Sequence, residues 1–348
     1  MTVSKVTFLW VLSALLALPA AAATSSVIRL DPALDELVSP DASTESLVQG
    51  DPGDSYEGPV WIRKPAPGYL LFTNVPANAI EKLTPDGKVS VFLNHIFTGD
   101  PATALHAGPR LMLGANGAAL DRQGRLVYTS YSAGEIVRLE KNGQRTVLAT
   151  KFDGKHINAP NDIVVRSDGA IYFTDSRMTT AQTTGPDCGK FWLVCGNTTG
   201  IPHKGVYFIK SGTVRLFSKD VDHPNGVVFS PNEKYLYVSN TLQKNILRFQ
   251  MKPDGTGMNE TVFADLGGDP AQGQPDGIKV DVLGNVYCTG PGGIWIFSPA
   301  GQHLGTLRMS ERATNFAFGD EDGKTLYLEG ATSLVRIRVK VAGQGFGS

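Results

Sequence analysis

Residues 222–240 read DHPNGVVFSPNEKYLYVSN, and this stretch decides the fold. It opens with an amide side chain, Asn225, at the head of an apolar run, and it turns at Pro231 and Asn232. It then returns through aromatic and β-branched residues from Tyr235 to Ser239, which are typical of strands. The stretch therefore predicts a β-hairpin with a polar side chain where its first strand begins.

The same pattern occurs six times along the chain. Each copy begins with a carboxylate or an amide ahead of an apolar run, and successive copies are 59, 45, 64, 51 and 39 residues apart. This spacing is close to that of propeller blades with loop insertions. The sequence predicts an all-β fold, a six-bladed β-propeller with four-stranded blades. The six polar positions are Glu57, Asn116, Asn161, Asn225, Asp276 and Asn315.

The first strands of a propeller surround one axis, so these six side chains are predicted to point at one place. A single Asn before Gly is an ordinary turn signal, but six polar residues in register favour a site. Carboxylate and amide oxygens suit a hard cation, Ca²⁺ first, with Mg²⁺, Mn²⁺ and, less well supported, Zn²⁺ as alternatives. Such a cation polarises a carbonyl or activates water, which is hydrolytic chemistry.

The beginning of the chain has the features of a targeting segment. Residues 1–23 carry one charge, Lys5, then an apolar core and a run of small residues suited to cleavage. We predict a signal peptide and export, to a periplasm or beyond; an uncleaved membrane anchor is the alternative. The formal charge of −1 gives no basic patch for nucleic acid and no polybasic membrane anchor after cleavage. The oligomeric state stays open.

Residues 24–56 are predicted to complete the ring. After Asn315 the chain offers only three strand runs, so a four-stranded last blade needs a strand from elsewhere. Residues 45–49, just before Glu57, are the natural donor, and their addition removes an exposed sheet edge. The propeller itself is predicted over residues 57–341.

One connection, residues 176–204, is far longer than its counterparts and carries Trp192. Antiparallel strands place the loops between second and third strands, and those between blades, on the face where each first strand begins. We therefore predict that this apolar loop covers the polar centre like a lid; a contact between subunits is the alternative. Cys188 and Cys195 can form a disulfide within the loop, whereas Cys288 lies in a strand and is expected to be a buried free thiol.

Several residues near this face are candidate substrate contacts. Arg177 is the second residue of the long loop, and His223 stands two residues before Asn225. Asn116 belongs to the predicted ring itself. A structural role, such as capping a turn, is the alternative for His223.

Six short motifs follow one another in a fixed order. They are YEGPVW at 56–61, NGAALDRQGRL at 116–126, NAPNDIVVRSDG at 158–169, PNG at 224–226, PDG at 275–277 and TNFAFG at 314–319. In this order and context the chain resembles the gluconolactonase and senescence-marker-protein (regucalcin) family, which also includes luciferin-regenerating-enzyme-like proteins. The resemblance covers roughly residues 28–341.

The resemblance implies a six-bladed propeller with one divalent cation held by Glu57, Asn161, Asn225 and Asp276. It also implies that Asp276 acts as a base or a nucleophile when a sugar lactone is opened, and that Asn161 touches the substrate. Two departures leave the substrate open. Ala159 stands where animal members carry a substrate-binding arginine, and residues 176–178 replace a Pro-Pro-Tyr-Gly stretch of many bacterial members.

Together these observations predict an exported, metal-dependent hydrolase that opens a cyclic ester, a sugar aldonolactone such as glucono-1,5-lactone. Two alternatives remain at this point. One is hydrolysis of another electrophile, such as a phosphotriester, which an apolar lid around Trp192 would favour. The other is a binding module without catalysis, in which the cation only stabilises the propeller.

Overall fold

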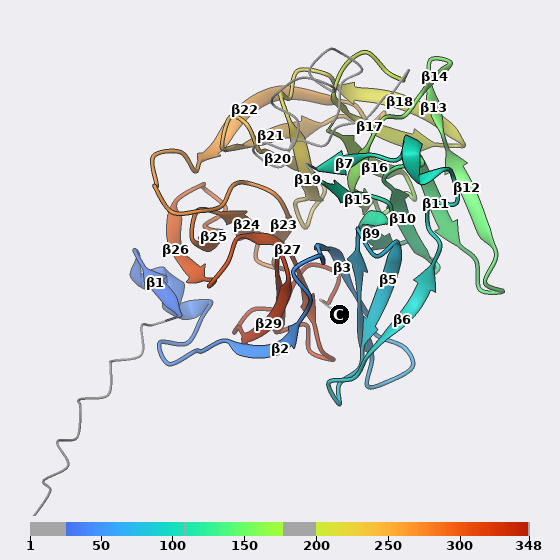
Figure 1. The fold of residues 1–348 in the computed structure, drawn as a ribbon. Helices are drawn as coiled ribbons and strands as arrows, with labels where there is room; N and C mark the ends of the chain where they lie inside the picture. Colours follow the sequence, from blue (N-terminus) through green and yellow to red (C-terminus); the bar gives the residue numbers. More distant parts are fainter. Residues whose placement is uncertain (1–25, 108, 177–199, 347–348) are drawn as a thin grey trace, which may run out of the picture.

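The structure, a computed structural model, describes residues 26–107, 109–176 and 200–346. Five four-stranded sheets and one five-stranded sheet stand around a central axis (Figure 1), and the prediction of a six-bladed propeller is confirmed. Two short 3-10 helices, η1 (Pro32–Glu36) and η2 (Pro101–Thr103), are the helical elements of the described ranges. No helix in these ranges is long and apolar enough to cross a membrane.

The first three blades are consecutive antiparallel sheets, each running outward from the axis in chain order. Blade one comprises β3 (Tyr56–Ile62), β4 (Tyr69–Asn74), β5 (Ala79–Leu83) and β6 (Val89–Asn94). Blade two comprises β9 (Ala115–Leu120), β10 (Leu126–Ser130), β11 (Glu135–Leu139) and β12 (Arg145–Ala149). Blade three comprises β15 (Pro160–Val165), β16 (Ile171–Asp175), β17 (Gly205–Lys210) and β18 (Thr213–Ser218).

The other three blades follow the same plan. Blade four comprises β19 (Pro224–Phe229), β20 (Tyr235–Asn240), β21 (Asn245–Met251) and β22 (Gly257–Asp265). Blade five comprises β23 (Ile278–Val280), β24 (Val286–Gly290), β25 (Gly293–Phe297) and β26 (His303–Arg308). Blade six comprises β27 (Ala313–Gly319), β28 (Thr325–Gly330), β29 (Ser333–Arg338) and β2 (Glu45–Gln49). Two small hairpins lie between blades, β7 (His106–Ala107) with β8 (Arg110–Leu111), and β13 (Lys151–Phe152) with β14 (Lys155–His156).

The first strands form the inner ring, where each contacts the next and β27 contacts β3. Apolar side chains on the two faces of each sheet pack against the neighbouring blades, and second strands such as β4 and β16 are buried on both faces. The ring of Tyr172, for example, packs edge to face on Phe229 of the next blade, with centroids 4.9 Å apart. Packing between blades therefore fixes where the inner strands begin.

The ring is closed by the N-terminal segment, as predicted. Strand β2 pairs antiparallel with β29, and Glu45 faces Arg336 across the pair and accepts two hydrogen bonds from it. Figure 1 shows β2 along the outer edge of blade six. Cys288 is a buried free thiol, again as predicted, whereas Cys188 and Cys195 lie outside the described residues.

One N-terminal element was not predicted. Strand β1 (Val27–Arg29) pairs with β26 and adds a fifth strand to blade five. Helix η1 follows, and Leu34 of the helix together with Leu37 and Val38 just after it is buried in a cluster with side chains of blades five and six. A strand of three residues is too short to show an alternating pattern, so no periodicity in the sequence indicates it.

Replacing Leu34 with alanine will lower the free energy of unfolding by about 2–5 kcal/mol, because its side chain is 0% exposed and its loss leaves a cavity between two blades. Urea unfolding followed by circular dichroism measures the change. Leu30→Ala is the matched control, since Leu30 lies four residues away and is 59% exposed. A Leu34→Ala protein as stable as the control would show that η1 contributes nothing to the fold.

Candidate functional site

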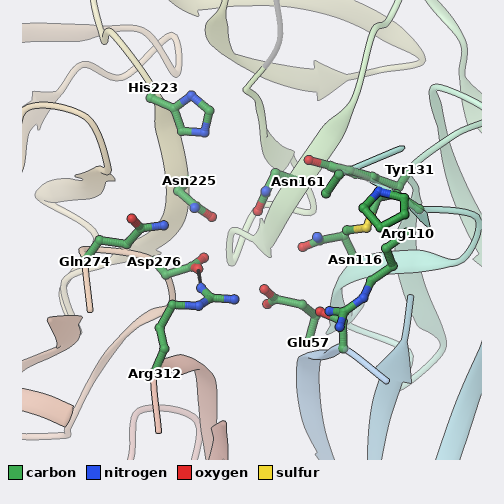
Figure 2. A pocket seen from close by; sticks show the side chains of 14 residues that line it. Glu57, Arg110, Asn116, Tyr131, Asn161, His223, Asn225, Gln274, Asp276 and Arg312 are labelled. Carbon is green, nitrogen blue, oxygen red and sulfur yellow. Dashed lines mark hydrogen bonds and ion pairs between the residues drawn. The ribbon is translucent and has the colours of Figure 1, made fainter. Parts of the chain in front are cut away.

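A pocket of about 280 Å³ lies at one end of the central axis, where the first strands begin. Figure 2 shows the side chains that surround it, and five of the six predicted polar positions are among them. All five are 3–8% exposed. They are Glu57, Asn116, Asn161, Asn225 and Asp276. The four residues predicted to hold a cation are thus together in one place.

Asn315, the sixth position, does not line this pocket, and the prediction that all six side chains point at one spot was wrong in this respect. Its amide nitrogen lies 3.4 Å from a carboxylate oxygen of Glu57, and its amide oxygen accepts a hydrogen bond from Lys279 at 3.1 Å. Asn315 therefore supports Glu57 from one side, while its oxygen is occupied by an ammonium group.

Buried hydroxyl groups of the second strands hold the main chain at the pocket. In three consecutive blades, such a hydroxyl accepts a hydrogen bond from a first-strand N–H of its own blade. The same hydroxyl donates to the carbonyl of the pocket residue in the next blade. The donors and their acceptors are Thr129 to Asn161, Thr174 to Asn225 and Ser239 to Asp276. The main chain of each of these three pocket residues is thus held by a hydroxyl group of the preceding blade.

Asp276 forms a buried ion pair with Arg312. The Nη1 atom of Arg312 donates to Oδ2 of Asp276 at 3.0 Å, and the two side chains are 11% and 7% exposed. Burial raises the pKa of Asp276 to about 6, and the positive charge of Arg312 opposes that rise. Asp276 is therefore mostly ionised at neutral pH, while its pKa is close enough to neutrality for proton transfer.

Glu57 lies across the pocket from this pair. Burial, followed by the negative charge of Asp276, raises the pKa of Glu57 well above its usual range. Two buried carboxylates that face the same space repel each other unless positive charge lies between them. This arrangement favours a cation in the pocket.

The amides complete a set of oxygen donors. Asn225 donates its amide N–H to Thr241 Oγ1 at 3.1 Å, which fixes the direction of its amide group. The amide oxygen of Asn116 is buried and has no hydrogen-bond partner among the described residues. Among the described residues, no three His, Cys, Asp or Glu side chains are placed so that they alone could hold a metal ion. Two carboxylates with amide oxygens are the donor set that Ca²⁺ or Mg²⁺ prefers, so the residues fit such a cation.

The structure describes only some of the other residues that were predicted to contact the substrate. His223 lines the pocket, burial lowers its pKa to about 4, and its buried Nδ1 has no hydrogen-bond partner among the described residues. Arg177 and Trp192 lie outside the described residues. Ala159 is buried in an apolar cluster with Met112 and Tyr131, both of which line the pocket.

The pocket residues that the sequence interpretation missed include three with long polar side chains, Arg110, Gln274 and Arg312. All three lie in connections between blades, which differ in length and carry no repeated pattern. The sequence indicated only that the connections between blades lie on the same face of the propeller as the pocket. Many residues meet this condition, so it does not single out these three.

The family model described as the SMP-30/Gluconolactonase/LRE-like region matches residues 56–332. The chain belongs to this family. The resemblance inferred from its motifs is thereby confirmed, and the match runs from β3 to β28, which includes the first strand of every blade.

Two gluconolactonases are similar over nearly the whole chain. The gluconolactonase of Zymomonas mobilis is 31% identical over 327 residues, which cover 91% of this chain and 87% of that protein. The structure of a gluconolactonase from Xanthomonas campestris is 28% identical, with a TM-score of 0.74, and covers 91% of this chain and 96% of that one. The calcium-binding protein regucalcin of Agrobacterium tumefaciens shares the fold, at 16% identity and a TM-score of 0.62 over 87% of this chain and 95% of its own.

Proposed function

We propose that this protein is an exported, metal-dependent lactonase that opens a sugar aldonolactone. The observation that carries the proposal is the pocket itself. Two buried carboxylates, Glu57 and Asp276, face each other with the amides of Asn161 and Asn225 beside them. Its two gluconolactonase relatives cover most of the chain and support hydrolysis of a lactone.

In the proposed reaction, a bound cation and the side chains of the pocket have separate roles. A divalent cation held by Glu57, Asn161, Asn225 and Asp276 would polarise the lactone carbonyl and offset the negative charge of the transition state. Asp276 takes the proton of the attacking water and returns it to the ring oxygen, which leaves as an alcohol; direct attack by its carboxylate is the alternative. Arg312 holds Oδ2 of Asp276, so that the carboxylate keeps one orientation.

Hydroxyl groups of the substrate have partners around the pocket. The buried oxygen of Asn116 and the Nδ1 atom of His223 have no hydrogen-bond partner among the described residues, and both side chains line the pocket. A volume of about 280 Å³ is at the lower end for small-molecule sites, which suits one monosaccharide unit.

Metal removal tests the proposal. Purified mature protein treated with a chelator will hydrolyse glucono-1,5-lactone at least about a hundredfold more slowly than untreated protein, and added Ca²⁺, Mg²⁺, Mn²⁺ or Zn²⁺ will restore turnover. The acid released by ring opening is followed with a pH indicator. Turnover of phosphotriesters but not of lactones would favour the other hydrolase. A protein that binds the cation and hydrolyses neither would be a binding module.

Export is proposed from residues 1–23 alone. Mass spectrometry of the protein recovered from the periplasm or the culture medium tests the proposal, because the exported protein should lack residues 1–23. Full-length protein found in the cytoplasm would contradict it.

A further inference from the structure

Arg110 brings a positive charge to the pocket without a carboxylate to neutralise it. It belongs to the small hairpin of β7 and β8, in the connection between blades one and two, and it lines the pocket. Its guanidinium donates to the carbonyl of Pro52 at 3.0 Å. No ion pair within 4.0 Å joins it to a carboxylate of the described residues.

The base of this hairpin is firmly held. Met112 donates its N–H to the carbonyl of Leu105 at 2.7 Å, and Ser132 of blade two joins both sides. The hydroxyl of Ser132 donates to the carbonyl of Met112 at 2.6 Å and accepts from the N–H of Leu105 at 2.9 Å. Leu105 and Met112 are also buried, at 2% and 8% exposed. Arg110 therefore comes from a fixed support at the edge of the pocket.

The charges that line the pocket do not favour a neutral ligand. Apart from the imidazole of His223, the titratable groups of known sign that line the pocket are two carboxylates, Glu57 and Asp276, and two guanidiniums, Arg110 and Arg312, so their formal charges sum to zero. A divalent cation held by the carboxylates would leave the pocket with a surplus of two positive charges. Such a surplus attracts an anion and is strongest where water is excluded.

The two guanidiniums differ in their availability. Arg312 is already paired with Asp276, whereas Arg110 donates to a main-chain carbonyl and forms no ion pair with a carboxylate of the described residues. Figure 2 shows that they reach the pocket from different sides, Arg312 beside Asp276 and Arg110 from the side of Asn116. A lactone whose carbonyl lies near Asp276 therefore presents its far end toward Arg110.

We propose that the preferred substrate is an aldonolactone with an anionic group at the end remote from its carbonyl, and that Arg110 binds this group. Carboxylate, sulfonate and phosphate share the required chemistry, since each offers a guanidinium two or more oxygens. The proposal rests on the proposed function, because it places the carbonyl at Asp276.

The test compares a neutral lactone with two anionic ones, glucono-1,5-lactone against an aldarolactone with a terminal carboxylate and a 6-phospho-aldonolactone. We expect kcat/KM to be at least about tenfold higher for an anionic lactone, and the preference to shrink as salt is added. Arg110→Gln will lower kcat/KM for that lactone about ten- to a hundredfold, mainly through KM, and will affect the neutral one far less. Arg110→Lys will recover part of the loss.

Arg63→Gln is the matched control, since Arg63 is an exposed arginine that does not line this pocket and instead contacts the ring of Phe346. It will leave both activities unchanged. Equal losses on neutral and anionic lactones in Arg110→Gln would overturn the proposal, as would a wild-type protein without charge preference. The relative rates of the two anionic lactones tell which group is bound.

Binding of the products separates this proposal from the proposed function. Calorimetry compares gluconate with 6-phosphogluconate on the metal-loaded protein, and it needs no turnover. Tighter binding of the phosphate, reduced by Arg110→Gln, supports the role of Arg110 even if no lactone is hydrolysed. Equal binding of the two acids contradicts that role even if lactones are hydrolysed.

Discussion

Replacing Asp276 with asparagine will lower kcat for lactone hydrolysis by about a thousandfold, with the fold intact. An amide cannot accept the proton of the attacking water, but it keeps the size of the carboxylate and an oxygen that can accept from Arg312, which now donates at 3.0 Å. Initial rates with saturating lactone measure the loss, and circular dichroism checks the fold. Wild-type turnover in a metal-loaded Asp276→Asn protein would refute the role of Asp276.

Asp281→Asn is the control for this variant. Asp281 belongs to the same blade and is also buried, but it lies at the turn after β23, where Asn285 donates to it, and it does not line the pocket. Its variant can lose stability but should keep turnover per folded molecule. Wild-type activity should also rise with pH through the pKa of Asp276, which is about 6 without a cation and lower with one. Asp276→Asn should not show this rise.

Glu57→Gln will weaken calcium binding by at least about a hundredfold, because one of two charged ligands becomes a neutral amide. The metal-free variant should be at least as stable as the wild type, since burial and the charge of Asp276 already disfavour the ionised form of Glu57 and raise its pKa. Calorimetry measures the affinity. Thermal unfolding gives a second readout, because calcium at a hundred times its Kd stabilises the wild type by about 2.7 kcal/mol. At the same calcium concentration this gain should fall to about 0.4 kcal/mol or less in Glu57→Gln.

Glu329→Gln is the matched control for that experiment. Glu329 is 0% exposed, its pKa is raised well above its usual range by burial and then by the charge of Glu57, and it does not line the pocket. Its variant should bind calcium like the wild type. If calcium affinity fell equally in both variants, the loss would come from removing a buried negative charge near the pocket and not from removing a ligand at Glu57.

The six blades could be predicted because each first strand has the same pattern, a polar residue followed by an apolar run. Glu57, Asn161, Asn225 and Asp276 stand at the head of an apolar run, and the geometry of a propeller brings such positions together. Strand β2 followed from counting the strands of the last blade. Strand β1 did not, because its place depends on contacts with β26 that no local pattern indicates.

The site could be predicted only where it repeats. Asn315 has the same sequence context as the other five residues, yet the ammonium of Lys279 occupies its oxygen. Arg110 and Arg312 lie in connections of unequal length, so their approach to the pocket depends on the path of each loop. Side chains that distinguish one substrate from another are therefore the part of this site least accessible from sequence.

Blade six is built from both ends of the chain, and this determines when the molecule can be completed. Strand β2 has to wait for β29, and the contact between Glu45 and Arg336 joins residues 291 positions apart. A growing chain can form the hairpins of the earlier blades from local contacts, but the two ends have to find each other afterwards, and such distant closure is slow. Damage at either terminus therefore opens the same blade.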